Sequence, residues 1–119
     1  MTDIARVKAR EAKTTPEDRI LLLMETVMIG NMARYDLPIW AWAQSDDNAR
    51  RVFKRALKKR FTFAAWLFEE AGFSIEQEKT RGRLMVTYMM GESTLVADSL
   101  SKDKKLLRLK HAILMAPES

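Results

Sequence analysis

The sequence contains no cysteine and little proline or glycine. Without cysteine the chain forms no disulfide, has no thiolate nucleophile and offers no sulfur ligand to a metal, which fits the reducing cytoplasm. Three prolines and four glycines in 119 residues supply too few turn signals for an all-β chain. The composition therefore favours a single helical domain.

Long apolar runs are also absent. The longest near the start, residues 20–24, ends at Glu25 and is far shorter than the ~20 residues that a membrane-spanning helix needs. Residues 1–13 carry several arginines and lysines and lack the apolar centre of a signal peptide. We therefore expect no contact with a membrane and a cytoplasmic location.

Candidate catalytic and metal-binding groups are few. The single histidine, His111, is expected inside the last helix, where it is more typical of a surface or interface residue than of a catalyst. The adjacent carboxylates Glu69 and Glu70 project in different directions from a helix and cannot act as a facing pair. The sequence has no EF-hand-like loop and no phosphate-binding glycine loop. We predict that the chain is not an enzyme and that it uses no cofactor or metal.

Cap signals and apolar spacing predict a series of helices. Thr15 is typical of an N-cap, and Pro16 follows at the first helical position, where its missing N–H costs nothing. Apolar residues at three- and four-residue spacing continue this helix to about residue 34. Asp36 and Pro38 mark a restart, and the short helix that follows contains two of the three tryptophans and ends at a polar cluster.

Two long helices come next. Ser45 is expected to cap the first of them, which continues to Ala71 and has Gly72 as its C-cap. Ser74 and Gln77 are spaced as a capping box, in which each side chain satisfies the free backbone N–H of the other residue. This pair predicts the start of the second long helix.

The second long helix is expected to run to about residue 100. A last helix starts near Ser101 and stops before Pro117. The predicted fold class is therefore all-α, with five to six helices in one domain of residues 1–119. Residues 1–15 are predicted to be a leading helix or a connector.

The residues from Leu84 to Met90 are apolar on every side of the helix that carries them. A helix that is apolar all round must be buried all round, and in a chain of this size one face meets the core. The opposite face is expected to meet a second copy, and a centrally buried helix in a monomer is the alternative. Small side chains at Gly91, Ser93 and Ala97 would let a partner approach closely.

Aromatic and thioether side chains gather on three helices that are expected to converge. They are typical of an apolar ligand site, but the same residues at helical spacing also fill an ordinary core. The set comprises Trp40, Trp42, Phe53, Phe61, Phe63, Trp66, Met85, Tyr88 and Met89. On the residues alone, core packing is favoured over a pocket.

Seven basic residues lie between positions 50 and 60, in a chain whose net charge is +5. The apolar residues of this helix also recur at three- and four-residue spacing and form one stripe. The opposite helix face carries four of the basic residues, Arg51, Lys54, Arg55 and Lys58. Such a face can hold phosphate groups, but no aromatic residue interleaves to stack on bases and no groove-reading motif is present. A solvated face is the favoured interpretation, and nonspecific nucleic-acid binding is the alternative.

Several separated groups of residues between Tyr35 and Gly91 keep the spacing of one protein family. They are Tyr35-Asp36-Leu37-Pro38-Ile39, Trp42-Ala43 with Ser45-Asp46, Leu67-Phe68 with Glu70-Ala71-Gly72-Phe73-Ser74, and Arg81 with Arg83-Leu84, Tyr88 and Gly91. On these residues the chain resembles the C-terminal regulatory domain of TetR-type transcriptional regulators, over about residues 16–117. The resemblance implies an all-helical domain that dimerises and, in many members, binds a small effector.

The chain also departs from the family pattern. Residues 1–34 are too few to hold the helix-turn-helix domain that precedes this region in the family, so we expect no specific DNA contact by this chain alone. Trp40 stands where relatives often have arginine, and Leu57 where they often have a carboxylate; both changes predict a more apolar ligand. Asp47 and Gly82 stand where proline and alanine are common, and Gly82 indicates a close helix crossing.

The resemblance implies two sites. The last two helices would form a four-helix bundle between two copies, with the interface residues Val86, Met90, Gly91, Ser93, Ala97, Leu106, Leu109 and Ile113. The ligand site would contain Trp40, Trp42, Phe53, Leu57, Phe61, Met85, Tyr88 and Met89. The function implied is a homodimeric regulatory domain that senses a small apolar effector. Its alternatives are an interaction protein that forms mixed dimers with a full-length regulator, and the nonspecific nucleic-acid binder described above.

Overall fold

The computed structural model describes residues 15–118 and is entirely helical over that part of the chain, with no strand. Its α-helices are α2 (Pro16–Ile29), α3 (Asp36–Ala43), α4 (Asp47–Glu70), α5 (Ile75–Gly91) and α6 (Lys104–Leu114). A π-helical turn, η1 (Glu92–Val96), continues α5, and a 3-10 turn, η2 (Ser99–Lys102), precedes α6. The predicted all-α class is confirmed for these residues, and the leading helix or connector predicted before Thr15 lies outside them.

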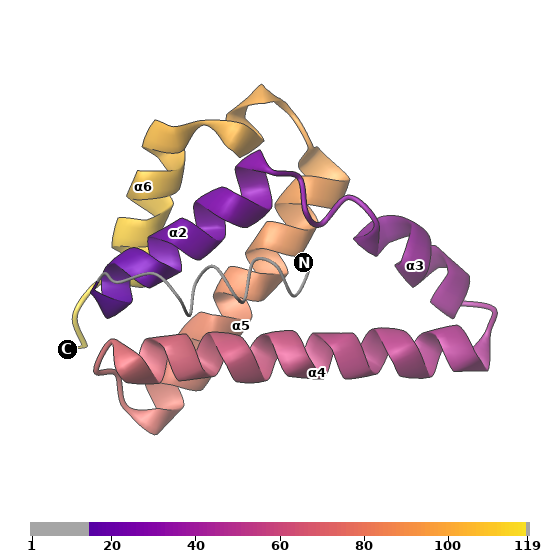
Figure 1. The fold of residues 1–119 in the computed structure, drawn as a ribbon, viewed down its shortest axis with the longest axis horizontal. Helices are drawn as coiled ribbons and strands as arrows, with labels where there is room; N and C mark the ends of the chain where they lie inside the picture. The colour runs from indigo at the N-terminus through magenta and orange to yellow at the C-terminus, as the bar shows by residue number, and fades with distance from the viewer. Residues whose placement is uncertain (1–14, 119) are drawn as a thin grey trace.

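The longest helix, α4, forms one edge of the molecule, and α5 crosses it in the most extensive contact between two helices (Figure 1). At one end of this crossing α2 and α6 lie side by side. At the other end α3 packs against the N-terminal half of α4, away from α2 and α6. None of the helices in residues 15–118 combines the length and the apolar character needed to cross a membrane.

The hydrophobic core lies where α2, α4 and α5 meet, and α6 closes it with Leu107. The apolar stripe predicted for α2 is buried as expected, because its residues recur at three- and four-residue spacing along one face. The largest fully buried side chains are Phe68, Ile20, Leu23, Met24, Leu67, Met85, Met89, Leu107, Val27 and Val86. These residues place the core away from α3, which contributes none of them.

Capping side chains set the first residues of α2 and α4. Thr15 caps α2 as predicted, because its Oγ1 accepts a hydrogen bond from the Asp18 N–H at 3.2 Å. The prediction of Ser45 as the cap of α4 is wrong by one residue. Asp46 has an extended backbone, and its Oδ1 accepts from the Ala49 N–H at 2.9 Å, which is the bond that an N-cap makes.

The predicted capping box at the start of α5 forms in one direction. The Ser74 hydroxyl accepts from the Gln77 N–H at 3.5 Å. The Gln77 side chain turns along its own helix instead, where its Oε1 accepts from Arg81 Nε at 2.9 Å. The Ser74 N–H donates to the Glu118 carboxylate at 2.7 Å, so the C-terminal segment takes the role predicted for Gln77.

Two helices end earlier than predicted because the backbone enters the left-handed region. After α2, Asn31 has a φ of 52°, and the expected continuation to about residue 34 is replaced by turns. After η1, Ala97 has a φ of 46°, and its N–H donates to the Glu92 carbonyl at 2.7 Å, across one residue more than an α-helical bond spans. The second long helix therefore ends at Val96, well before residue 100. Gly72, with a φ of 96°, lies just past the end of α4 as predicted.

A capping pair that was not predicted starts η2. The Asp98 carboxylate accepts from the Leu100 N–H at 3.0 Å, and the Ser101 hydroxyl accepts from the Asp98 N–H at 3.2 Å. The last helix then begins at Lys104, capped by Asp103, rather than near Ser101. It ends before Pro117, as predicted.

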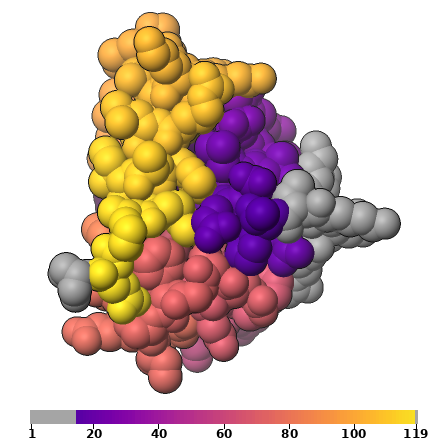
Figure 2. Space-filling view, turned by 90° about the vertical axis from the view of Figure 1, so that its left-hand side faces the viewer, coloured from indigo at the N-terminus to yellow at the C-terminus, as the bar shows by residue number. Residues whose placement is uncertain are grey.

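The segment after α6 runs back to the turn between α4 and α5 (Figure 2). Arg81 Nη1 donates to the backbone carbonyls of Leu114 at 2.7 Å and Ala116 at 2.6 Å, and its guanidinium lies 4.1 Å from the centre of the Phe73 ring. His111 Nε2 lies 2.8 Å from the Glu17 carbonyl and joins α6 to the start of α2.

The close helix crossing predicted at Gly82 is confirmed. A Cβ atom added there would lie 2.9 Å from the backbone nitrogen of Ala65 and 3.1 Å from the carbonyl carbon of Ala64. Both atoms belong to the rigid backbone of α4, so a side chain at this position would push the two helices apart. Gly82 therefore sets the distance between α4 and α5.

We expect Gly82→Ala to lower the free energy of unfolding by about 1 kcal/mol, although alanine favours helix. Overpacking costs about 1–3 kcal/mol, which exceeds the propensity gain of about 1 kcal/mol. The matched control is Gly91→Ala on the same helix, where an added Cβ meets nothing within 4 Å and a gain of about 0.5–1 kcal/mol is expected. Urea unfolding measures both, and equal effects of the two substitutions would contradict the close crossing.

Candidate ligand site

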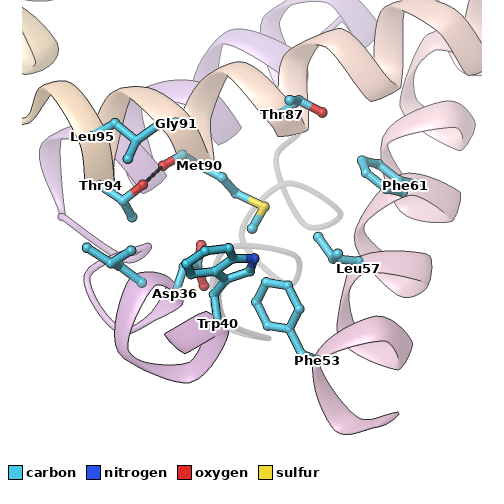
Figure 3. A pocket seen from close by; sticks show the side chains of 11 residues that line it. Asp36, Trp40, Phe53, Leu57, Phe61, Thr87, Met90, Gly91, Thr94 and Leu95 are labelled. Atoms are coloured by element: carbon cyan, nitrogen blue, oxygen red, sulfur yellow. Dashed lines mark hydrogen bonds between the residues drawn. The ribbon is translucent and has the colours of Figure 1, made fainter. Parts of the chain in front are cut away.

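An apolar pocket of about 440 Å³ lies between α3, α4 and the C-terminal end of α5 (Figure 3). Four predicted ligand residues line it together, namely Trp40 from α3 and Phe53, Leu57 and Phe61 from α4. The three α4 residues follow one another at four-residue spacing, which aligns them on one face of the helix. The remaining wall consists of Asp36, Leu37, Thr87, Met90, Gly91, Thr94 and Leu95.

The pocket exists because α3 packs chiefly on α4 and stands away from α5. The wall opposite Trp40 is formed by the end of α5 and by η1. In this wall the Thr94 hydroxyl donates to the Met90 carbonyl at 2.6 Å, which satisfies a polar group beside an apolar space. The π-helical turn thus brings Thr94 and Leu95 to the pocket, and turns of this kind are frequent at functional sites.

A buried ion pair joins α3 to α4 beside the pocket. The Arg60 guanidinium donates from Nη1 to Asp36 Oδ2 at 3.0 Å and from Nη2 to Asp36 Oδ1 at 2.9 Å, a two-bond arrangement. The side chains are 14% and 6% exposed. Arg60 Nη1 also lies 3.5 Å from Met90 Sδ, so the same guanidinium reaches α5. This contact positions the start of α3 against both walls of the pocket.

The other predicted ligand residues lie elsewhere. Met85 and Met89 are fully buried in the core, so they line no part of this pocket. Trp42 is on the exposed side of α3. The Tyr88 hydroxyl accepts a hydrogen bond from Lys110 of α6, and Tyr88 is not part of the pocket wall. The core-packing alternative therefore describes the two methionines and Phe63 correctly, and Trp66 packs against the same core. Trp40, Phe53 and Phe61 line the pocket, whereas Trp42 is exposed.

Much of the far wall of the pocket consists of residues that were not predicted to line it. Thr94 and Leu95 lie in the π-helical turn, and no local signal predicted that α5 changes its winding there. Met90 and Gly91 were predicted for the dimer surface, but the structure places them in the pocket wall. The pairing of Asp36 with Arg60 joins residues 24 positions apart, and helical periodicity carries no information on such a contact.

The predicted interface residues are also dispersed. Val86 is buried in the core of the chain, which corrects its assignment to a surface. Ser93 donates to Met28 Sδ at 3.4 Å, and Ala97 lies on the bend after η1 rather than on a helix. Leu106 is half-buried, whereas Leu109 and Ile113 of α6 are exposed. Leu84 of α5 is exposed as well. One apolar residue of the stretch 84–90, which was predicted to be buried on every side, is therefore accessible to solvent.

Six of the seven basic residues between positions 50 and 60 are exposed on α4. Arg60 is the exception, since it forms the buried pair with Asp36. Arg50 forms an exposed ion pair with Asp47 at 3.3 Å. The four residues predicted to share one face, Arg51, Lys54, Arg55 and Lys58, are all exposed.

Within residues 15–118, no group of three or more histidines and carboxylates is arranged to hold a metal ion. The sequence matches no protein-family model, and comparison with curated proteins and with solved structures likewise finds no match.

We expect Asp36→Asn to lower the free energy of unfolding by about 3 kcal/mol, because it leaves the guanidinium of Arg60 largely buried without its counter-charge. The double variant Asp36→Leu with Arg60→Met should lose less, since both charges are removed together. As a control, Asp47→Asn breaks the exposed pair with Arg50 and should change stability by less than about 1 kcal/mol. Urea unfolding compares them; similar losses from Asp36→Asn and Asp47→Asn would contradict a structural role of the buried pair.

Proposed function

We propose that the chain is a TetR-like regulatory domain that binds a small, mostly apolar effector in the pocket between α3, α4 and α5. The observation that carries the proposal is the pocket itself, which unites Trp40, Phe53, Leu57 and Phe61 around about 440 Å³. A concave apolar site with few polar groups is the usual form of a small-molecule site. The sequence resemblance to the TetR-type domain supports the same role.

Two departures from the family pattern shape this site. Trp40 and Leu57 stand where the resemblance implies an arginine and a carboxylate, and both line the pocket. The charges of Asp36 and Arg60 beside the pocket are paired with each other. The interior therefore suits an apolar body better than a charged one, because a buried charge without a partner is costly.

We further propose that the chain acts as a homodimer through one face of α5 and α6. Tyr88 contacts Lys110, and Arg81 donates to the Leu114 carbonyl, so side chains of α5 reach α6 at two points. Leu84 lies one turn from both Tyr88 and Arg81 on α5, and Ile113 is an exposed apolar residue of α6. Leu84 and Ile113 are 58% and 67% exposed, which leaves apolar area for a second copy to cover.

The pocket is tested by thermal unfolding with two neutral probes, decanol and 2-naphthol. Each is expected to raise the Tm of the wild-type chain, because a ligand at a hundredfold its Kd stabilises the folded state by about 2.7 kcal/mol. Leu57→Trp fills the pocket and should abolish the shift. Val52→Trp, on the exposed side of α4, should preserve it. No shift with either probe, or an undiminished shift in Leu57→Trp, would contradict the proposed site.

The dimer is tested by light scattering across a dilution series. We expect the mass of two chains for the wild type and of one chain for Leu84→Glu and Ile113→Glu, since each variant places a charge in an apolar interface. Val52→Glu is the matched control, because Val52 is equally exposed but lies on α4. A wild-type chain that is monomeric at every concentration would rule out the homodimer. Subunit exchange with a full-length regulator would then test the mixed-dimer alternative.

A further inference from the structure

One cationic side chain of α4, Lys54, lies close in sequence to the pocket residues. Lys54 precedes the lining residues Leu57 and Phe61 by three and seven positions, spacings that place it beside them on the helix rather than on the opposite face predicted for it. Lys54 is exposed, whereas the pocket residues Phe53, Leu57 and Phe61 are partly buried. The apolar stripe of α4 therefore has a positive charge at its solvent edge.

A second cation stands beside the pocket on α5. The Arg83 guanidinium lies 4.9 Å from the centre of the Phe61 ring, and Phe61 is part of the pocket wall. Arg83 also lines a shallow groove on α5 with Lys79, Thr80, Leu84 and Thr87. Thr87 belongs to both the groove and the pocket, so the two spaces adjoin. Lys54 on α4 and Arg83 on α5 thus place two positive charges next to residues of the pocket wall, and these two cations are called the positively charged shelf below.

The charges of this shelf are available to a ligand. Among residues 15–118, no ion pair joins Lys54 or Arg83 to a carboxylate. Asp36 is the one acidic residue that lines the pocket, and Arg60 holds both of its oxygens. An anion at the shelf therefore meets cations nearby and no uncompensated negative charge within the described walls.

We infer that the effector is an amphipathic anion, a molecule whose apolar body fills the pocket and whose carboxylate rests on Lys54 and Arg83. The inference depends on the proposed function, because it names the chemical class of molecule that the same pocket takes. Transfer of the apolar body from water to the aromatic side chains of the pocket is favourable, because it removes apolar surface from water. The carboxylate stays at the exposed edge, where it keeps part of its hydration and gains two charge-assisted contacts.

The inference is tested with three ten-carbon probes that differ only in their head group, decanoate, decanol and decylamine. Calorimetric titration below the concentration at which they self-associate measures each Kd with the wild-type chain. We expect decanoate to bind about fivefold more tightly than decanol for each cation that it contacts, the range of an exposed ion pair. Decylamine should bind more weakly than decanol, because its charge is repelled by the same shelf.

The variants Lys54→Gln and Arg83→Gln should each weaken decanoate binding about fivefold and leave decanol binding unchanged. Lys59→Gln is the matched control, because it removes the same charge from the opposite side of α4, two residues from Leu57. Equal affinities for decanoate and decanol, or an equal loss on Lys59→Gln, would overturn the amphipathic anion and leave an apolar ligand site intact. Absence of binding by all three probes would overturn the ligand site as well.

Discussion

The close crossing of α4 and α5 at Gly82 is the constraint on which the rest of the molecule depends. The backbone of α4 at Ala64 and Ala65 leaves no room for a side chain there, so the separation of the two longest helices is fixed at one point. On one side of the crossing the helices diverge around the core, which α2 and α6 complete. On the other side they diverge around the pocket, with Phe53 and Leu57 facing Met90 and Gly91 across it.

The pair of Asp36 and Arg60 complements this constraint. The crossing determines where the pocket opens, and the ion pair determines where its third wall, α3, comes to rest. Both charges are largely buried, and the cost of removing them from water is offset only while the two hydrogen bonds between Arg60 and Asp36 are kept. The short helix α3 contributes nothing to the largest buried side chains, so its position rests on this polar contact and on its packing against α4.

Local signals in the sequence predicted the helices well and their meeting points poorly. Thr15, Gly72 and Ser74 act at helix ends as predicted, because a cap is a contact between near neighbours in the chain. Gly82 was also informative, since glycine within a helix has a cost that a close approach explains. The end of α5 was not predictable in the same way, because a π-helical turn and a left-handed alanine leave no compositional signal. Nor could spacing show which apolar residues, such as Met85 and Leu57, would fill the core and which would border a space.

The three tryptophans occupy three different environments. Trp42 is 60% exposed, Trp66 is half-buried and stacks on Phe63 with 5.8 Å between ring centres, and Trp40 lines the pocket. The indole emission of the chain is therefore a sum of three signals, of which the pocket touches one directly. With Trp42 and Trp66 replaced by phenylalanine, the fluorescence of Trp40 alone would report changes at the pocket wall, without an added label.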